Sequence, residues 1–370
     1  MKICYLGAGN SVHIKRWCEY FSSRGYEVSL ITLHPVTELK NVKIYQIKSR
    51  LNRYMDIAFF LNRRKILSIL NEIKPDILHG HYLINYGFYS AALKYRPLVL
   101  STWGSDVLVA PVESIRHRLM LKYAVSNADV ITVESQYIKN ILKDKYKVSE
   151  NKLAIFSWGT DCNVFSIRYT EEVEKLRNKL GIQNGQTVIL SPRSLFPIYN
   201  IYTIVQSISD VLQQNPDTVF VFLRGSCNLD YEKKIQNLVA KLNIERNCKF
   251  IEDFLSPCEM AVLYNLSDIF ISIPFSDSVS ISLLEGMACG TIPLVNSLPV
   301  NCELIKDEIN GLIIPNTAKD ELAKKINYAI KNKNTFKTRF ADYNQKYILE
   351  EHNWHKNAVK MEEIYKKLVI

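Results

Sequence analysis

Short apolar runs alternate with amphipathic segments of helical spacing along the whole chain, and this pattern limits the possible folds more than any other feature. In the first half, the strand-like run 1–9 is followed by an amphipathic segment at 12–26 and a second apolar run at 27–35. The alternation begins again after residue 165, with the apolar run 187–194. Strand–helix–strand units form parallel sheets with helices on both faces, so the sequence predicts two α/β domains.

The length of 370 residues also indicates two domains, because a single hydrophobic core rarely grows beyond roughly 250–300 residues. The second set of apolar runs starts after the segment 157–167, where we place the join. We therefore expect Rossmann-like domains at 1–165 and 166–345. The remaining stretch, 346–370, contains an amphipathic segment and is expected to form a C-terminal helix.

Positive charge is concentrated in the first half of the chain. Residues 1–165 hold 23 Lys and Arg against 13 Asp and Glu, a balance of +10, whereas residues 166–370 hold 24 of each kind. Two clusters interleave basic with apolar residues: Arg50, Arg53, Arg63, Arg64 and Lys65, then Arg116, Arg118 and Lys122. Such a basic amphipathic surface suits an anionic membrane or another polyanionic partner, with a solvated helix face as the alternative. Nucleic acid is not an expected partner, because no recognised binding motif accompanies the charge.

The cysteines and the apolar runs indicate the compartment. The eight cysteines form no C-x2–4-C pair, so the sequence does not support a zinc site, and no metal is expected. Their scatter through apolar segments is typical of reduced thiols in the cytosol. No apolar run approaches the ~18 residues of a membrane span, and the N-terminus reads as a strand and a glycine turn instead of a signal peptide. We expect a cytoplasmic protein, with peripheral binding to the inner face of the cell membrane as an option.

Two acidic residues mark the most informative segment of the second half. The strand-like run 269–275 ends in small polar residues, and a helix is predicted to begin near Ser282. Asp277 lies in the loop and Glu285 about one turn into the helix. A strand–loop–helix junction presents free backbone N–H groups to an anion, so the two acids would flank an anion-binding floor. This suits a ligand with phosphates and hydroxyls, and the alternative is an ordinary βα unit with two solvated acids.

The pair Asp277 and Glu285 resembles the acid-x7-acid motif of retaining family-4 (group 1) glycosyltransferases. Other segments resemble that family in the same order along the chain, namely PDILHGHY, STWGSD, SWGTDCNVF with Gly159, Asp161 and Phe165, and SPRSLFPIYN. The resemblance implies the GT-B fold, in which two Rossmann-like domains face each other across a cleft and the C-terminal helix packs back on the first domain.

The resemblance also implies roles for individual residues at the donor site. Asp277 would lie near the reacting carbon, and Arg193 would stabilise the departing diphosphate. Glu285 would accept hydrogen bonds from the ribose. Further donor-binding positions are Ser280, Ile281, Ser282, Gly9, Tyr199, Asn200 and Arg224. The chain departs from the family at Asp277, where glutamate is usual, and at Tyr199, where lysine is usual.

Four residues of the first half are candidates for acceptor binding: His13, Trp103, Asp106 and His81. Trp103 could stack on a sugar ring, although it could also be an ordinary loop tryptophan. His13 could instead cap the helix that follows it. His81 points to the same face of a strand as His79, but a metal site would need a third ligand and core packing is the other reading.

The resemblance implies a retaining, metal-independent transfer without a cofactor, from a UDP- or GDP-type sugar to a lipid-linked or polysaccharide acceptor of the cell envelope. A sugar-nucleotide epimerase or hydrolase on the same fold remains an alternative, as does a catalytically silent sugar-binding scaffold. A dinucleotide oxidoreductase is disfavoured, because Val12 takes the place of the third glycine after Gly7 and Gly9, and no acid ends the run 27–35.

Overall fold

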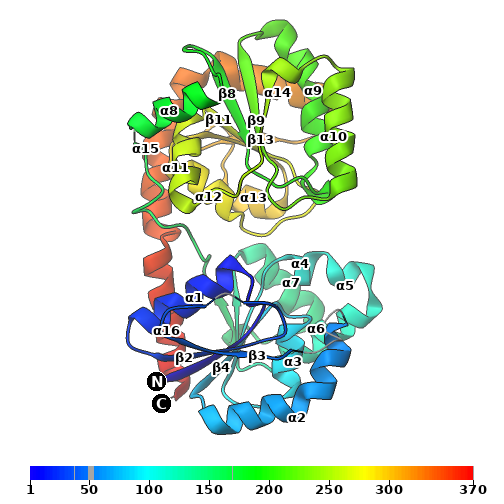
Figure 1. Ribbon diagram of the computed structural model, residues 1–370, viewed down its shortest axis with the longest axis vertical. Helices are drawn as coiled ribbons and strands as arrows, with labels where there is room; N and C mark the ends of the chain where they lie inside the picture. Colours follow the sequence, from blue (N-terminus) through cyan, green and yellow to red (C-terminus); the bar gives the residue numbers. More distant parts are fainter. Residues whose placement is uncertain (37, 49–53, 169, 370) are drawn as a thin grey trace. The chain divides into compact units, whose positions relative to one another are not determined.

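The computed structural model describes residues 1–36, 38–48, 54–168 and 170–369, and contacts divide the chain into two compact units (Figure 1). Unit 1 consists of Met1–Ser157 together with the residues from Ala358 onward, and unit 2 is Trp158–Asn357. The join therefore falls within the expected segment 157–167, and residues 158–165 lie in unit 2. Two residues of the predicted basic clusters, Arg50 and Arg53, lie outside the described residues.

Unit 1 is built on a parallel sheet, which has seven strands within its described residues. The strand order is β3-β2-β1-β4-β5-β6-β7, so the chain reverses direction across the sheet between β1 and β4. This is the order of a Rossmann-type sheet extended by one strand. The strands are β1 Lys2–Leu6, β2 Glu27–Thr32, β3 Val42–Gln46, β4 Ile77–His81, β5 Leu98–Ser101, β6 Val130–Val133 and β7 Leu153–Ile155.

Helices cover the sheet of unit 1 because each buries one apolar stripe. In the first helix this stripe includes Trp17 and Phe21, and the Ser11 side chain caps its N-terminus by accepting from the His13 N–H. The helices are α1 Val12–Ser23, α2 Met55–Ile73, α3 Tyr86–Ala92, α4 Ser105–Leu108, α5 Ala110–Glu113, α6 Ile115–Ser126 and α7 Gln136–Tyr146. The alternative prediction that His13 caps this helix is therefore wrong, because Ser11 is the N-cap residue.

Unit 2 repeats the architecture around a six-stranded parallel sheet in the order β10-β9-β8-β11-β12-β13, counted over its described residues. Its strands are almost fully buried, in agreement with the apolar runs of the sequence. The strands are β8 Thr187–Ser191, β9 Thr218–Leu223, β10 Cys248–Ile251, β11 Ile269–Ser272, β12 Ile292–Asn296 and β13 Leu312–Ile314. Two parallel α/β sheets confirm the predicted pair of Rossmann-like domains.

Two layers of helices enclose the sheet of unit 2 (Figure 1). Helices α9, α10 and α14 form one layer, and helices α8, α11, α12 and α15 lie on the other face. The bounds are α8 Glu171–Lys179, α9 Ile201–Gln214, α10 Leu229–Lys241, α11 Pro257–Leu266, α12 Ile281–Ala288, α13 Pro299–Leu304, α14 Lys319–Lys331, α15 Lys333–Glu351 and α16 Trp354–Val369.

The expected C-terminal helix 346–370 is divided between two helices. Its first residues belong to α15, and α16 begins at Trp354 after a break in which the Asn353 side chain accepts from the His355 N–H at 2.9 Å. The amphipathic segment 353–370 agrees closely with α16, whereas the expected bounds from 346 wrongly included the last turns of α15. Most of α16 then packs in unit 1.

A tight turn at Gly159 meets the break between α15 and α16 within unit 2. Gly159 has φ +73°, a left-handed conformation that favours glycine. A Cβ atom added there would lie 2.1 Å from the His352 carbonyl oxygen. That same oxygen accepts a hydrogen bond from the Thr160 N–H at 2.8 Å, and the Trp354 N–H donates to the Thr160 carbonyl at 2.9 Å. The backbone at Gly159 and Thr160 therefore lies directly against the backbone of residues 352–354, and a side chain at position 159 would force the two segments apart.

Helix α16 is fastened to unit 1 by polar contacts in its core. The Tyr365 hydroxyl is hydrogen-bonded to His79 Nδ1 on β4 and lies 3.2 Å from the Tyr5 hydroxyl on β1. Closer to the surface, the Glu362 carboxylate pairs with Arg24 and accepts from the Tyr26 hydroxyl. Helix α16 thus completes the core around β1 and β4, although unit 2 lies between these elements in the sequence.

Candidate donor and acceptor sites

The strand order of unit 2 places its candidate site at a change of direction. Strands β8 and β11 are neighbours although β9 and β10 lie between them in the sequence. In open α/β sheets, ligands bind outside the carboxyl ends of the strands at such a switch point. Arg193 follows β8 and Asp277 follows β11, so topology alone brings the two predicted catalytic residues to one edge.

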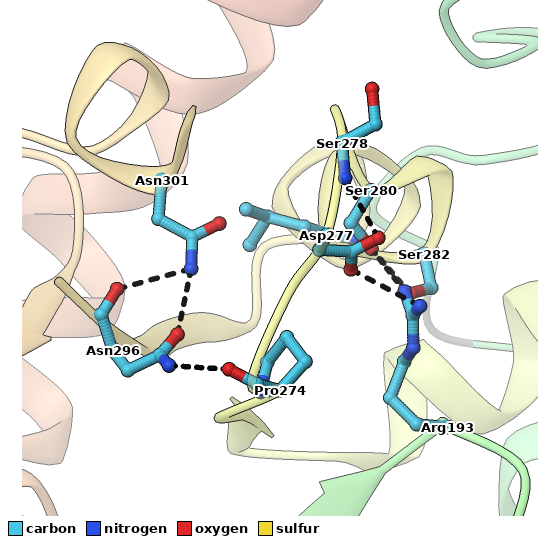
Figure 2. Close-up of polar contacts among 9 residues, drawn as sticks. Arg193, Pro274, Asp277, Ser278, Ser280, Ser282, Asn296 and Asn301 are labelled. Atoms are coloured by element: carbon cyan, nitrogen blue, oxygen red, sulfur yellow. Dashed lines mark hydrogen bonds and ion pairs between the residues drawn. The ribbon is translucent and has the colours of Figure 1, made fainter. Parts of the chain in front are cut away.

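Arg193 is the centre of a polar cluster (Figure 2). One terminal nitrogen, Nη2, lies 3.1 Å from Oδ2 of Asp277. The other, Nη1, donates to the hydroxyls of Ser280 at 2.6 Å and Ser282 at 3.3 Å. These two hydroxyls lie 2.9 Å from each other. The structure thus joins four residues that the sequence singled out, and it shows a direct Arg193–Asp277 ion pair that the sequence did not predict.

The ring of Tyr199 packs against the Arg193 guanidinium. The Arg193 guanidinium lies over the Tyr199 ring, 4.1 Å from its centroid, which is close enough for a cation–π interaction. Asn200 follows in a left-handed conformation with φ 54° and is the N-cap residue of α9, and its side chain accepts from the Thr203 hydroxyl at 2.7 Å. Tyr199 therefore orients Arg193, while the contacts of Asn200 shape the turn into α9.

Helix α12 begins at Ile281, close to the position predicted from the sequence. The Ser280 side chain caps it by accepting from the Leu283 N–H at 3.4 Å. The first N–H groups of a helix lack partners within the helix and carry a partial positive charge. Arg193 lies beside this end, so a guanidinium and a helix N-terminus act on the same region of space. The arrangement suits a ligand with two adjacent negative groups.

Glu285 lies on the first half of α12 and has a partner that the sequence did not reveal. The buried Tyr264 on α11 donates its hydroxyl to Oε2 of Glu285 at 3.1 Å. This contact fixes one carboxylate oxygen and so orients the side chain. No sequence signal pointed to Tyr264, because α11 and α12 meet only in the folded unit.

Burial and charge act in opposite directions on Asp277. Burial has the larger effect and raises the pKa of the Asp277 carboxyl above its usual value, while the Arg193 charge and the Ser278 N–H lower it in part. The Ser278 N–H donates to Oδ1 at 3.0 Å. The ion pair with Arg193 thus favours the ionised carboxylate in a place where it would otherwise tend to take up a proton.

Two asparagines anchor the loop that carries Asp277 (Figure 2). Asn296, the last residue of β12, donates to the Pro274 carbonyl at 2.7 Å. Asn301 on α13 donates in turn to the backbone and side-chain oxygens of Asn296, both at 3.0 Å. A polar residue directly after the apolar run of β12 was the signal that could have identified Asn296. The loop is therefore held from the neighbouring strand and not only from its own ends.

Arg224 does not join the cluster through any contact with Arg193. It follows β9, and its guanidinium pairs with the largely buried Glu232 on α10 at 2.5 Å. The Cys227 thiol donates to the same carboxylate at 3.3 Å. The predicted donor-binding role of Arg224 remains a prediction, since its charge is already balanced within this loop.

The predicted acceptor residues gather at the corresponding edge of unit 1. Strands β1 and β4 are neighbours at the switch point, and the turn at Gly9 follows β1 while His81 ends β4. Gly9, which the resemblance assigned to donor binding, is explained by packing within its own unit, because an added Cβ would lie 2.8 Å from the Val36 Cβ. Its N–H donates to the Thr32 hydroxyl at 3.0 Å.

Three rings form one aromatic cluster at this edge. The His13 and Trp103 rings meet edge to face with centroids 5.3 Å apart, and the Trp103 indole N–H donates to His81 Nδ1 at 3.4 Å. Burial lowers the pKa of His13 to about 4, with a further contribution from the Arg16 charge. Burial also holds the pKa of His81 well below its usual value. Both imidazoles are therefore neutral near pH 7.

Asp106 has a role that the sequence did not suggest. It is fully buried, and its two oxygens accept from the Leu83 N–H at 2.7 Å and the Trp103 N–H at 3.0 Å. Burial raises its pKa to about 6, against the effect of these backbone hydrogen bonds. Its carboxylate therefore fixes the loop that presents Trp103, in place of the predicted contact with an acceptor hydroxyl.

The two histidines of β4 belong to the core. The His79 and His81 rings stack with centroids 4.2 Å apart, and His79 bonds to Tyr365 and to the Ser101 hydroxyl.

Among the residues that the structure describes, no three His, Cys, Asp or Glu side chains are grouped to hold a metal ion. Within the same residues, no helix has the length and apolar character needed to cross a membrane.

Two protein-family models match the sequence. Residues 2–135 match the model described as glycosyl transferase 4-like, and residues 172–364, more than half of the chain, match that of the glycosyl transferases group 1. The chain belongs to the group 1 glycosyltransferase family. As predicted, it is a hexosyltransferase-type enzyme.

Known relatives of this group 1 glycosyltransferase are named as glycosyltransferases or as a glycolipid synthase, and solved glycosyltransferase structures share its fold. An uncharacterized glycosyltransferase of Methanocaldococcus jannaschii is 25% identical over 98% of this chain and 95% of its own. The alpha-monoglucosyldiacylglycerol synthase of Streptococcus pneumoniae is 28% identical over 75% of this chain and 63% of its own. Among solved structures, a glycosyltransferase of Rickettsia africae has a TM-score of 0.81 at 17% identity, covering 100% of this chain and 98% of its own. HepE of Anabaena, in complex with UDP and glucose, has a TM-score of 0.80 at 17% identity, with 100% of both chains covered.

Proposed function

We propose that this group 1 glycosyltransferase moves a sugar, with retention of configuration, from a UDP- or GDP-type sugar to a hydroxyl of a membrane-associated or cell-envelope saccharide. The observation that carries the proposal is the position of Arg193, which lies at the N-terminus of α12 and is paired with Asp277. A diphosphate is the ligand that best matches a guanidinium beside a helix N-terminus. Asp277 and Glu285 supply acceptors for the hydroxyls of the sugar and the ribose.

The residues on unit 2 act by orientation and by stabilising charge. Arg193 can exchange its contacts with Ser280 and Ser282 for phosphate oxygens, and its interaction strengthens as the diphosphate departs. The leaving phosphate takes the proton of the attacking acceptor hydroxyl, so the reaction requires no protein base and no metal ion. Tyr199 keeps the guanidinium in place but adds no second charge.

Two relatives support the substrate classes. HepE of Anabaena has been crystallised with UDP-glucose, which favours a nucleotide-diphosphate sugar as donor here. The streptococcal relative is named for a glucosylated diacylglycerol, which favours a lipid-borne acceptor. The basic balance of the first half of the chain is consistent with an anionic membrane as the place where the acceptor is met.

A thermal-shift panel tests the donor assignment. The full chain is heated with UDP-, GDP-, CDP- and ADP-sugars and with NADH, and a ligand that binds the folded state raises the melting temperature by mass action. One nucleotide-sugar is expected to give the largest shift, and turnover with a lipid-linked saccharide distinguishes a transferase from a scaffold. A shift with NADH alone, or release of free sugar at the same rate without acceptor, would contradict the proposal.

Glu285→Ala is expected to raise the donor KM, because the ribose loses its charged acceptor. A hydrogen bond to a charged group contributes roughly 1.5–3 kcal/mol, which corresponds to about 10- to 150-fold in affinity. Tyr264→Phe is the matched control, since it removes the hydroxyl that orients Glu285 but leaves the carboxylate. It should have a smaller effect in the same direction, measured by donor titration. Unchanged donor binding in Glu285→Ala would mean that Glu285 does not contact the ribose.

Tyr199→Leu is expected to weaken donor binding by about two- to fivefold, because a cation–π contact contributes roughly 0.5–1 kcal/mol and positions Arg193. Tyr199→Phe keeps the ring and loses only the hydroxyl, so its donor affinity should match that of the parent. If Tyr199→Phe loses as much as Tyr199→Leu, then the hydroxyl contacts the donor and the ring is not the relevant group.

A further inference from the structure

An apolar groove on unit 1 has no part in the sites described above. It has a volume of about 960 Å³ and is lined by residues of α2 and α6 and by Phe88 of α3. Its apolar walls include Met55, Ile57, Phe60, Phe88, Ile115 and Leu119. A volume of this size falls in the range of small-molecule sites, but so apolar a lining does not suit a sugar or a nucleotide.

The side chains at the mouth of the groove are exposed to an unusual degree. Ile115 is 73% exposed, Leu119 63% and Phe60 55%. Contiguous apolar surface of this kind is unfavourable in water and marks an interaction site in soluble proteins. Single exposed apolar side chains elsewhere on the chain need no such explanation.

Basic residues outnumber acidic ones on the two helices that form the groove. Helices α2 and α6 together carry six basic residues, Arg63, Arg64, Lys65, Arg116, Arg118 and Lys122, against two acidic residues, Asp56 and Glu72. Inside the groove, Arg116 forms an ion pair with Asp56, which also accepts from the Tyr89 hydroxyl at 2.6 Å. Arg63 donates to the Ala92 carbonyl at 3.1 Å, so part of the charge also fastens α2 to α3.

An apolar groove formed by two helices rich in basic residues fits one class of partner, a lipid with a hydrocarbon tail and an anionic head. Helices that lie in the plane of a membrane interface combine the same features, with apolar side chains inserted and Lys and Arg at the headgroups. A second copy of this chain fits less well. A two-fold contact would place the same basic helices opposite each other, where their like charges repel.

We infer that the groove between α2 and α6 receives a hydrocarbon chain of an anionic membrane lipid. Unit 1 then binds an anionic bilayer by insertion of apolar side chains as well as by charge. This inference deepens the proposed function, because it rests on an acceptor that is presented at a membrane. It also makes a separate claim, since membrane binding here does not depend on the donor.

Photo-crosslinking locates the lipid on the unaltered full chain. Phosphatidylglycerol vesicles containing a phospholipid with a diazirine on its acyl chain are irradiated with the protein, and the adducts are mapped by mass spectrometry. Adducts are expected to concentrate in 54–60 and 115–123, the segments of α2 and α6 that line the groove. Adducts concentrated elsewhere on the chain, or none at all, would overturn the inference.

A pair of substitutions tests insertion directly. Ile115→Ser with Leu119→Ser should weaken binding to phosphatidylglycerol vesicles by about tenfold or more, because two side chains lose their burial in hydrocarbon. Leu229→Ser is the control, since Leu229 lies on α10 of unit 2 and is 63% exposed, the same fraction as Leu119. The control should bind vesicles as the parent does, and all three proteins should melt at the same temperature. Equal binding by the double variant and the control would mean that no insertion occurs at the groove.

Two further readouts separate the possible failures. The melting-temperature shift caused by the nucleotide-sugar should be the same in the parent and in the double variant, because Arg193, Asp277 and Glu285 lie in unit 2 and neither substituted residue is a donor-binding position. If no nucleotide-sugar shifts the parent while its adducts still map to the groove, the donor assignment fails and the lipid groove stands. Sedimentation equilibrium without lipid addresses the other occupant. Self-association of the parent that the double variant abolishes would make the groove an interface between copies and would overturn the lipid assignment.

Discussion

Arg193→Ala is expected to lower kcat of sugar transfer by about 10²–10³-fold, the effect seen when one group that stabilises developing charge is removed. Arg193 contacts Asp277, Ser280, Ser282 and Tyr199 at once. Its loss would also leave the Asp277 carboxylate buried without its countercharge, and the pKa of Asp277 would rise further.

The comparison of two ligands shows whether this effect concerns the transition state. Binding of a nucleoside monophosphate should fall much less than kcat, because the charge that Arg193 meets grows as the diphosphate leaves. Arg193→Lys is the control, since lysine keeps the charge but cannot reach three polar partners with a planar fork. It should recover part of the activity. Equal losses in kcat and in monophosphate binding would show that Arg193 only anchors the ground state.

Gly159→Ala is expected to destabilise unit 2 by about 2–4 kcal/mol. The left-handed backbone costs an L-residue roughly 1–2 kcal/mol, and displacing a hydrogen-bonded carbonyl adds about 1 kcal/mol or more. The alanine Cβ would lie 2.1 Å from the His352 carbonyl oxygen, so the hydrogen-bonded contact of Thr160 with His352 and Trp354 must open. Urea unfolding followed by circular dichroism measures the loss.

Gly181→Ala is the matched control for this prediction. Gly181 also has a positive φ, 64°, but an added Cβ there meets nothing within 4 Å. The control should lose only the part due to backbone conformation, about 1–2 kcal/mol. The difference between the two variants then isolates the clash with His352. Equal losses would mean that the backbone around the turn moves aside without cost.

The fold could be predicted from the sequence because its determinants are local. Buried parallel strands are continuous apolar runs, and the helices between them have a period of 3.6 residues. The N-terminus of α12 was placed within two residues, because Ser280 and Ser282 are typical of a helix start. The start of α16 agrees with the amphipathic segment 353–370, but the expected helix from 346 ran across the break before Trp354, because the break depends on backbone contacts with Thr160.

The candidate site could be predicted only as a set of residues and not as an arrangement. A sequence motif indicated Asp277, and the position after a strand indicated Arg193, but nothing in the spacing predicted that their side chains would pair. The role of Tyr199 depends on the ring of one loop lying against the guanidinium of another. The role of Asp106 could not be predicted, because the sequence does not show whether an aspartate is exposed or is buried and bonded to backbone N–H groups.

The position of Tyr365 has a consequence for how the protein is made. During translation, the strands of unit 1 leave the ribosome before unit 2, yet the Tyr365 hydroxyl that bonds to the buried His79 lies 286 residues further along the chain and follows unit 2. Unit 2 is a continuous stretch and can complete its core while unit 1 still lacks its final helix. Until α16 is added, the His79 imidazole of unit 1 lacks its hydrogen bond to the Tyr365 hydroxyl, which costs about 1–3 kcal/mol. Truncation within α16 would therefore destabilise unit 1, although the strands of that unit are translated before unit 2.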